Sequence, residues 1–289
     1  MDTAELLKKV RKVEIKTRGL SKQIFSGEYN SAFKGRGMSF SEVRSYQYGD
    51  DVRNIDWNVT ARTGEAHIKV FEEERELTVI LLIDVSKSAF FGMGEQMKND
   101  MITELCAVLS FSAINNNDKV GVLFFSDRIE KFIPPKKGKT HILRIIRELL
   151  DFEPVGKETD IGMALEYFNN MVKKRCICFV LSDFMADGYD TALRIAARRH
   201  DLIGMHIYDP KEKELPNIGM IRVVDAETGS FHYLDTSSAK VRSAQSDWFS
   251  KNNAYFKTAF AKSGADLISL RTDQPYTGPL LNFFKKRSK

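Results

Sequence analysis

The sequence of 289 residues contains no run of about 18 apolar residues, and it therefore predicts no transmembrane helix. It also lacks a charged start followed by an apolar segment, so no signal peptide is expected. Cysteine is scarce: the chain has only Cys106, Cys176 and Cys178, with no CxxC pair and nothing that resembles a disulfide framework. Such cysteines are typical of a reducing compartment, and we therefore expect a cytoplasmic protein.

Several catalytic and nucleic-acid-binding signatures are missing as well. The five histidines are dispersed and no HExxH motif occurs, which argues against zinc catalysis. The glycines between residues 18 and 76 are not followed by GKS or GKT, so they do not indicate a phosphate-binding loop. The net charge of +5 is mild, and the densest basic cluster is the C-terminal tail, which is typical of a solvated end. Nucleic-acid binding has no other support in the sequence.

The chain changes character at Thr78. Before it, residues 2–17 have the apolar spacing of an amphipathic helix, and residues 18–76 are polar, punctuated by glycine and rich in both charge signs. A basic helix of this kind can lie on a membrane surface, but its apolar stripe is thin, so we expect it to dock on its own protein. We therefore expect residues 1–77 to be an appended segment that packs on the main domain without a large core of its own.

Residues 78–289 alternate buried strands with helices. The apolar runs TVILLI, VGVLFF, CICFVL and LIGMHIY predict strands, and the segments between them have helical spacing. Such alternation implies right-handed crossovers, so the expected fold is an α/β doubly wound, mainly parallel sheet with helices on both faces. Toward the end we expect an antiparallel hairpin at residues 221–225 and 231–234, a long helix at residues 238–262 capped by Gly264, and a last strand at residues 266–270.

The first of these strands ends in a compact group of oxygen side chains. Asp84 follows the apolar run directly, and Ser86 and Ser88 follow at alternate positions. A lone carboxylate is too costly to bury in the core, so Asp84 should lie at the carboxyl edge of the sheet, where open α/β sheets bind ligands. One carboxylate and two hydroxyls at this spacing suit a hard divalent cation, Mg²⁺ first.

Two more places with oxygen side chains are expected at the same edge of the sheet. Thr159 and Asp160 precede a predicted helix, and Ser182 and Asp183 follow the strand CICFVL. Taken singly, these residues are equally typical of helix caps, with Ser88 and Thr159 at N-caps and Asp84 and Asp183 as capping carboxylates. Three such places in order, each at a strand end or a helix start, favour a shared metal site instead.

This pattern resembles the metal-ion-dependent adhesion site of the von Willebrand factor A domain. That family has Asp-x-Ser-x-Ser after its first strand, a Thr before a middle helix and an Asp after the next strand, and all five positions match. The resemblance implies that Ser86, Ser88 and Thr159 touch the metal and that Asp84 and Asp183 hold it directly or through water. It also implies one open coordination position for an acidic side chain of a partner protein.

A second resemblance covers nearly the whole chain. The stretch YGDDVRNIDWNVTARTGEAHIKVFEEERE, joined to LLIDVSKS, is similar to the signature of bacterial domain-of-unknown-function family fifty-eight. Members are commonly encoded beside MoxR-type AAA+ ATPases, which implies an adaptor role or a part in maturing protein complexes. Many members carry N-terminal transmembrane helices, and none is predicted here.

The densest motif of this stretch allows two interpretations. Its residues Arg53, Asp56, Trp57 and Arg62 can form either a patch that faces a partner or a buried, paired network that clamps residues 18–76 onto the sheet. We favour the clamp, because Trp and paired charges are costly to leave exposed. The acidic pair Asp50 and Asp51 is expected to pair with Arg44 or Arg53 rather than to bind metal.

Two functions from different classes follow. The first is a non-enzymatic binding module that depends on Mg²⁺ or Mn²⁺ and works with a MoxR-type ATPase or a client protein. The second is a phosphoryl-transfer hydrolase with Asp84 as the nucleophile. Haloacid dehalogenases, which use that chemistry, need Asp-x-Asp at this point, and this chain has Ser86 in place of the second Asp. Because the general acid is missing, the sequence favours the binding module.

Overall fold

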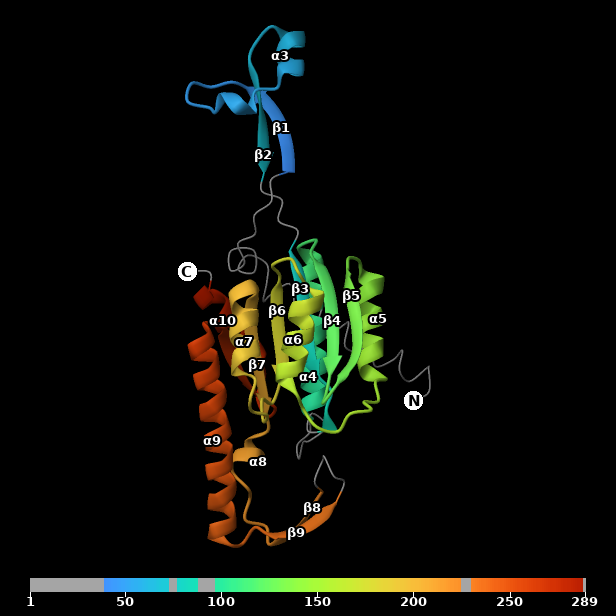
Figure 1. Cartoon of the computed structure of the whole chain (residues 1–289), viewed down its shortest axis with the longest axis vertical. Coiled ribbons are helices and arrows are strands. Elements are labelled where there is room, and N and C mark those ends of the chain that lie inside the picture. The colour runs from blue at the N-terminus through green and yellow to red at the C-terminus, as the bar shows by residue number, and fades with distance from the viewer. Residues whose placement is uncertain (1–38, 73–76, 88–96, 225–229, 288–289) are drawn as a thin grey trace. The chain divides into compact units, whose positions relative to one another are not determined.

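The computed structural model describes residues 39–72, 77–87, 97–224 and 230–287 (Figure 1). Its contacts divide the chain into two compact units, one of residues 34–77 and one that contains residues 78–289. The helix expected at residues 2–17 lies outside the described residues, and the packing of residues 1–77 on the larger unit stays a prediction. Among the described helices, none combines the length and the apolar character needed to cross a membrane.

The small unit is a two-stranded antiparallel sheet with two short helical turns. Its strands β1 and β2 pair directly, and a helix between them, α3, is capped by the side chain of Asp56 and ends at Gly64, which has a φ of 78°. Where side-chain exposure is described in this unit, Ile68 is the one buried apolar residue. The elements are β1 (Ser39–Ser45), η1 (Val52–Asn54), α3 (Trp57–Thr63) and β2 (His67–Glu72).

The large unit is built on a six-stranded sheet in the order β10-β7-β6-β3-β4-β5. All neighbours are parallel except β4 and β5, so the mainly parallel sheet expected from the sequence is confirmed. The edge strand β5 runs through Pro134 and Pro135, which an edge tolerates better than an interior strand does. The strands are β3 (Thr78–Asp84), β4 (Lys119–Phe125), β5 (Ile129–Lys136), β6 (Ile177–Ser182), β7 (Asp201–Tyr208) and β10 (Asp266–Arg271).

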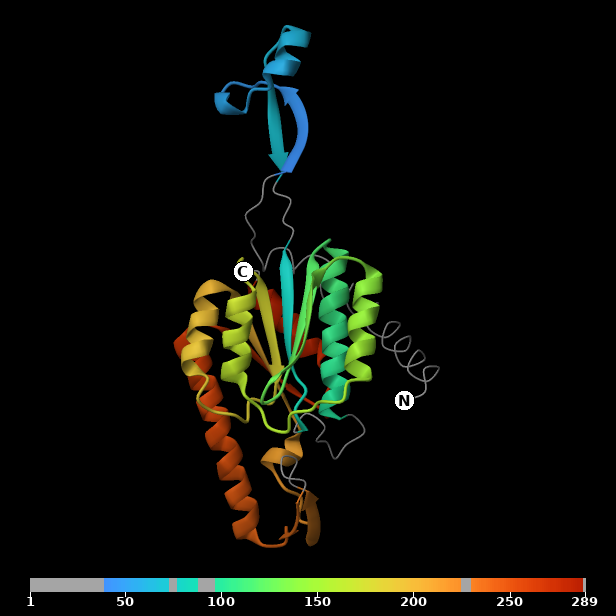
Figure 2. The same cartoon turned by 45° about the vertical axis from the view of Figure 1, so that its right-hand side comes forward.

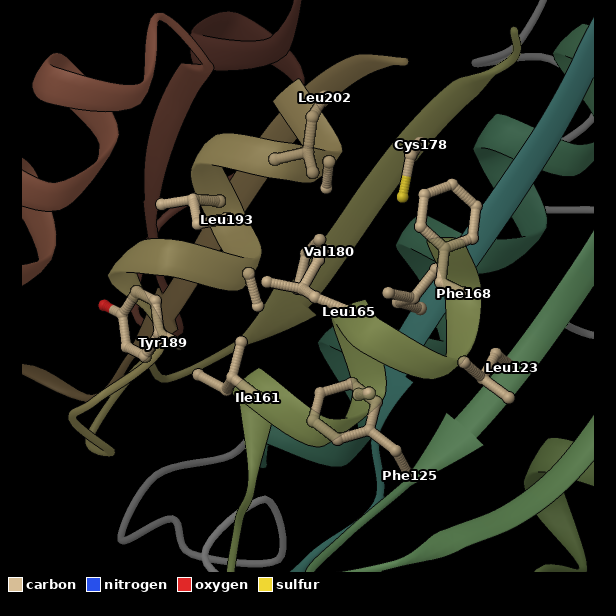
Figure 3. Close-up of a cluster of buried hydrophobic side chains, with 14 of the residues drawn as sticks. Leu123, Phe125, Ile161, Leu165, Phe168, Cys178, Val180, Tyr189, Leu193 and Leu202 are labelled. Atoms are coloured by element: carbon tan, nitrogen blue, oxygen red, sulfur yellow. The ribbon is translucent and has the colours of Figure 1, made fainter. Parts of the chain in front are cut away.

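Helices cover both faces of the sheet, which confirms the doubly wound arrangement (Figures 1 and 2). Side chains of α6, α7 and α9 pack on one face and form an apolar cluster with β3, β4 and β6 (Figure 3). On the other face, α4 contacts β3, β4 and β7, α5 packs beside α4, and α10 contacts β10. These helices are α4 (Lys98–Asn115), α5 (Lys139–Leu150), α6 (Ile161–Met171), α7 (Asp190–Arg199), α9 (Ala239–Ser263) and α10 (Thr277–Arg287).

The central strand β3 lies at the heart of the core. Residues 79–83 are each completely buried, because strands flank β3 on both sides and helices cover it on both faces. One close approach fixes α9 on the sheet: the ring of Phe260 lies where a side chain on Gly204 of β7 would stand, with its Cε1 atom 2.4 Å from an ideal Cβ position. A glycine is therefore required at this point of the strand.

The C-terminal part follows the expected order. A short helix, α8 (Pro210–Lys213), leads to the antiparallel hairpin of β8 (Met220–Val224) and β9 (Phe231–Asp235), and α9 follows it. Gly264 ends α9 with a φ of 75°, as its position in the sequence predicts. The hairpin and α8 lie beyond the edge of the sheet at which β3 and β6 end (Figure 1).

Candidate functional site

Asp84 stands at the carboxyl end of β3, as the sequence predicts. Only 2% of it is exposed, and both carboxylate oxygens are held: Oδ1 accepts the backbone N–H of Ser86 at 2.9 Å and Oδ2 accepts the Ser182 hydroxyl at 2.7 Å. Burial, and then the charge of Asp183, raise the pKa of Asp84 to about 6. Because the charged form of a buried acid next to another acid is costly, this carboxylate gains from a nearby cation.

Asp183 stands beside Asp84 because β6, which it follows, is the direct neighbour of β3 in the sheet. Its Oδ1 accepts the backbone N–H of Met185 at 3.2 Å, and the residue is buried. The next residue, Phe184, has a φ of 52°, which is unusual for a side chain other than glycine. Its N–H donates to the Ser182 hydroxyl at 3.0 Å, and that hydroxyl in turn donates to Asp84, so one chain of hydrogen bonds fixes the two strand ends.

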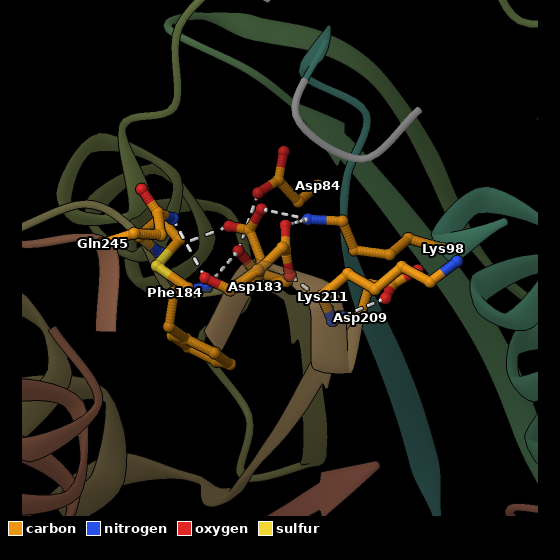
Figure 4. Close-up of polar contacts among 10 residues, drawn as sticks. Asp84, Lys98, Asp183, Phe184, Asp209, Lys211 and Gln245 are labelled. Carbon is orange, nitrogen blue, oxygen red and sulfur yellow. Dashed lines mark hydrogen bonds and ion pairs between the residues drawn. The ribbon is translucent and has the colours of Figure 1, made fainter. Parts of the chain in front are cut away.

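A third charged side chain in this site was not predicted from the sequence. Lys98, the first residue of α4, is 1% exposed, and its ammonium lies 2.9 Å from Asp183 Oδ2 and 2.6 Å from Glu212 Oε1 (Figure 4). Burial alone would lower the pKa of Lys98, but the two carboxylates outweigh it and raise that pKa above its usual value. Lys98 is therefore a permanent positive charge inside the site.

Glu212 enters the site from α8, a helix of four residues. Asp209 caps that helix, and the Glu212 carboxylate accepts the backbone N–H of Asp209 at 3.0 Å while it also accepts Lys98. Burial raises the pKa of Glu212, and the charge of Lys98 opposes that effect. The backbone carbonyl of Glu212 accepts the side-chain amide of Gln245 at 2.9 Å, which ties α8 to α9.

The loop that carries Thr159 is anchored at the same edge of the sheet. The N–H of Asp160 donates to the carbonyl of Ser126, which directly follows β4, at 2.9 Å. The carboxylate of Glu130 accepts the N–H of Gly156 at 2.7 Å and so holds the start of this loop. The N-cap of α6 is Asp160 rather than Thr159, because Asp160 Oδ1 accepts the N–H of Met163 at 2.8 Å.

The five residues expected to bind metal are therefore placed as follows. Asp84, Ser86 and Asp183 are buried at one edge of the sheet, Thr159 lies partly buried in the loop anchored there, and Ser88 lies outside the described residues. The donors are all oxygen atoms, which suit a hard divalent cation such as Mg²⁺. Within the described ranges, no group of three or more His, Cys, Asp and Glu side chains is arranged to hold a metal, so a site here depends on hydroxyls.

The charged motif of the small unit differs in part from the expectation. Arg44 pairs with both oxygens of Asp50 at 2.9 and 2.8 Å, as predicted, and Asp51 accepts the backbone N–H of Arg53 at 2.9 Å instead of pairing with its guanidinium. Within the small unit these residues form no buried network, since Trp57 is 70% exposed and Asp56 pairs with Lys69 at 3.7 Å. Whether they clamp this unit onto the sheet or form a patch that faces a partner stays a prediction.

Comparison with known proteins gives a family but no established activity. The family model described as "Protein of unknown function DUF58" matches residues 42–255. Uncharacterized proteins of Mycobacterium tuberculosis (Rv1480) and Mycobacterium bovis (Mb1516) are each 28% identical over 294 residues, which cover 99% of this chain and 91% of theirs.

The similar solved structures include three with low sequence identity to this chain. An aerotolerance-related membrane protein from Bacteroides fragilis is 14% identical with a TM-score of 0.49, and the match covers 73% of this chain and 98% of that one. BatB from Bacteroides thetaiotaomicron is 14% identical with a TM-score of 0.46 and the same coverage. The SpRpn10 VWA domain is 12% identical with a TM-score of 0.39, and the match covers 72% of this chain and 95% of that domain.

Proposed function

The chain belongs to the DUF58 family of proteins of unknown function, and from that premise we propose that it is a non-enzymatic protein-binding module that depends on a divalent metal. The observation that carries the proposal is the meeting of Asp84, Ser86 and Asp183 at the carboxyl edge of the sheet. Two buried acids on neighbouring strands, with hydroxyls beside them, form an oxygen-lined site that gains from a cation.

In this proposal Asp84, Ser86, Ser88, Thr159 and Asp183 hold Mg²⁺ or Mn²⁺. Such a cation would supply the positive charge that a Glu or Asp of a partner protein recognises. The chain's own residues orient that cation: the Ser182 hydroxyl fixes Asp84, and the N–H of Met185 fixes Asp183. The rigid sheet beneath the site keeps these ligands in place for a partner.

A phosphoryl-transfer role for Asp84 is the less favoured alternative. It needs a general acid two positions after the nucleophile, and a serine hydroxyl is too weak an acid for that task. The position of the missing general acid is occupied by Ser86. We therefore keep the non-catalytic role.

The partner we propose is a MoxR-type AAA+ ATPase or a client protein that such an ATPase remodels. This part rests on the motif resemblance given above, and the acidic side chain is the chemistry that the metal would recognise. We place the encounter in the cytoplasm, because the three cysteines are buried thiols with no disulfide between them. Peripheral contact with a membrane is compatible with this role.

The metal part is tested by thermal unfolding with and without Mg²⁺ or Mn²⁺. Metal at ten times its Kd should add about 1.4 kcal/mol of stability to the wild type. Asp84→Ala and Asp183→Ala should abolish that increment, while Asp247→Ala, at an exposed position on α9, should keep it. An equal metal-dependent rise in stability in all four proteins would show that Asp84 and Asp183 do not hold the metal.

The partner part is tested by binding of the ATPase encoded beside the gene, and of candidate clients, to purified protein. Ser86→Ala combined with Ser88→Ala should weaken binding to the level that a chelator produces in the wild type, without unfolding the chain. Ser243→Ala, at an exposed hydroxyl of α9, is the matched control and should bind normally. Equal binding by the double variant, with or without chelator, would show that the metal site is not the interaction surface.

A further inference from the structure

Lys98 is an unexpected occupant of a site that is proposed to hold a metal. A lysine is almost never completely buried, because its ammonium loses hydration that only close partners can replace. Here two carboxylates replace the water around the ammonium, Asp183 at 2.9 Å and Glu212 at 2.6 Å. Figure 4 shows the Lys98 side chain pointing from α4 toward the end of Asp183. The protein thus brings a cation of its own to this edge of the sheet.

Lys98 directly contacts one of the two carboxylate oxygens of a proposed metal ligand, Asp183. Asp183 Oδ1 accepts a backbone N–H from Met185, and Oδ2 accepts the ammonium of Lys98. A divalent cation bound at Oδ2 would stand within a few ångströms of the ammonium, and like charges at that distance repel strongly in a buried site. Glu212 offers Lys98 a second carboxylate to which it can withdraw, since it already accepts the same ammonium.

We propose that Lys98 is a tethered cation that competes with the divalent metal for Asp183, and that metal binding transfers Lys98 to Glu212 alone. This inference rests on the proposed metal-binding function and adds the residue that sets the metal affinity. Lys98 compensates the charge of Asp183 when metal is absent, and it makes metal binding conditional. The site therefore responds to metal concentration instead of holding its cation permanently.

The transfer has a path to the rest of the unit. Glu212 lies on α8, its carbonyl accepts the Gln245 side chain of α9, and the hairpin β8–β9 is the segment of chain between these two helices. A change in the ion pair of Glu212 should therefore shift α8 at the point where the chain enters the hairpin. The equilibrium between Lys98 and metal at Asp183 can therefore be followed in two ways, by metal binding at the sheet edge and by the position of α8.

The decisive experiment measures Mn²⁺ and Mg²⁺ affinity by calorimetry on the full chain. Lys98→Met keeps an unbranched side chain one atom shorter and removes the charge, and it should bind metal about tenfold tighter than the wild type or more, a difference of about 1.4 kcal/mol. The matched control is Lys213→Met, which removes the same charge from an exposed lysine of α8 that pairs with Glu214 at 3.2 Å. The control should change the affinity less than about twofold, because an exposed charge is screened.

A second pair of variants covers the case in which Lys98→Met does not fold. Glu212→Gln removes the carboxylate to which Lys98 withdraws, so metal should bind about tenfold weaker, whereas Glu214→Gln should leave the affinity nearly unchanged. Hydrogen exchange of the backbone amides at residues 209–214 gives a readout independent of affinity. Metal should change it in the wild type and leave it unchanged in Lys98→Met.

The outcomes separate this inference from the proposed function. Equal metal affinity in the wild type and Lys98→Met overturns the competition while the metal site stands. Metal binding by Lys98→Met alone overturns both the transfer of Lys98 to Glu212 and the metal dependence of the wild type, whose resident cation is then Lys98. If neither protein binds metal up to about 10 mM, a concentration far above any useful Kd, both ideas are overturned.

Discussion

Replacing Lys98 by Met should strongly destabilise the metal-free protein. The change leaves two acids of the site, Asp183 and Glu212, without the ammonium that now lies 2.9 and 2.6 Å from them. Removing one partner of a buried ion pair costs about 3–5 kcal/mol of folding stability, because the remaining charge stays desolvated. Glu212 is 13% exposed at its side chain and regains some water, so we expect about 4 kcal/mol.

The free energy of unfolding is best measured by urea titration in the presence of a chelator, so that no divalent cation substitutes for the lost ammonium. In a domain of about 200 residues, 4 kcal/mol corresponds to a fall of roughly 10 °C in Tm. Lys213→Met is the matched control, since its lysine is 49% exposed at the side chain, and should cost less than about 0.5 kcal/mol.

A triple variant tests whether uncompensated charge is the cause. Combining Lys98→Met with Asp183→Asn and Glu212→Gln removes the charges together, and most of the lost stability should return, because replacing a whole buried ionic group is often close to neutral. A loss below about 1 kcal/mol in Lys98→Met, or a triple variant no more stable than the single one, would refute this account of the site.

Three further predictions concern the core. Gly204→Ala should cost about 1–3 kcal/mol by overpacking, because its Cβ would stand 2.4 Å from the ring of buried Phe260, and Gly278→Ala, with nothing within 4 Å, should be nearly neutral in the same unfolding assay. Burial lowers the pKa of His200 to about 4, so the folded state keeps it neutral while the unfolded state protonates near 6.5. Stability should therefore fall by up to about 3 kcal/mol as pH drops from 6.5 to 4, and His200→Gln should flatten that pH profile even if its absolute stability differs. Burial raises the pKa of all three cysteine thiols, so a thiol reagent should label them only under unfolding conditions, and fast labelling of the native protein would contradict their placement.

Much of the large unit could be read from local pattern. An apolar run such as residues 79–83 is stable only where both faces are covered, and the structure places it at the centre of the sheet. Asp84 ends β3 and Asp183 directly follows β6, because a carboxylate cannot continue such a run, and parallel strands bring those ends to one edge. The hairpin and the capped long helix carry equally local signals, namely a turn and a terminal glycine.

The place of Lys98 could be decided only in three dimensions. In the sequence it is one basic residue among many at the start of a helix, 14 positions after Asp84, and no spacing rule marks it. Its burial depends on α4 beginning beside the end of β6 and on α8 bringing Glu212 to the same point, contacts that span 85 and 114 positions. Trp57 is the opposite case, an apolar side chain that the sequence predicts to be buried. It is exposed because the small unit has too little core to cover it. Composition and periodicity determine which residues must leave water, whereas the packing of distant elements decides which charges they meet there.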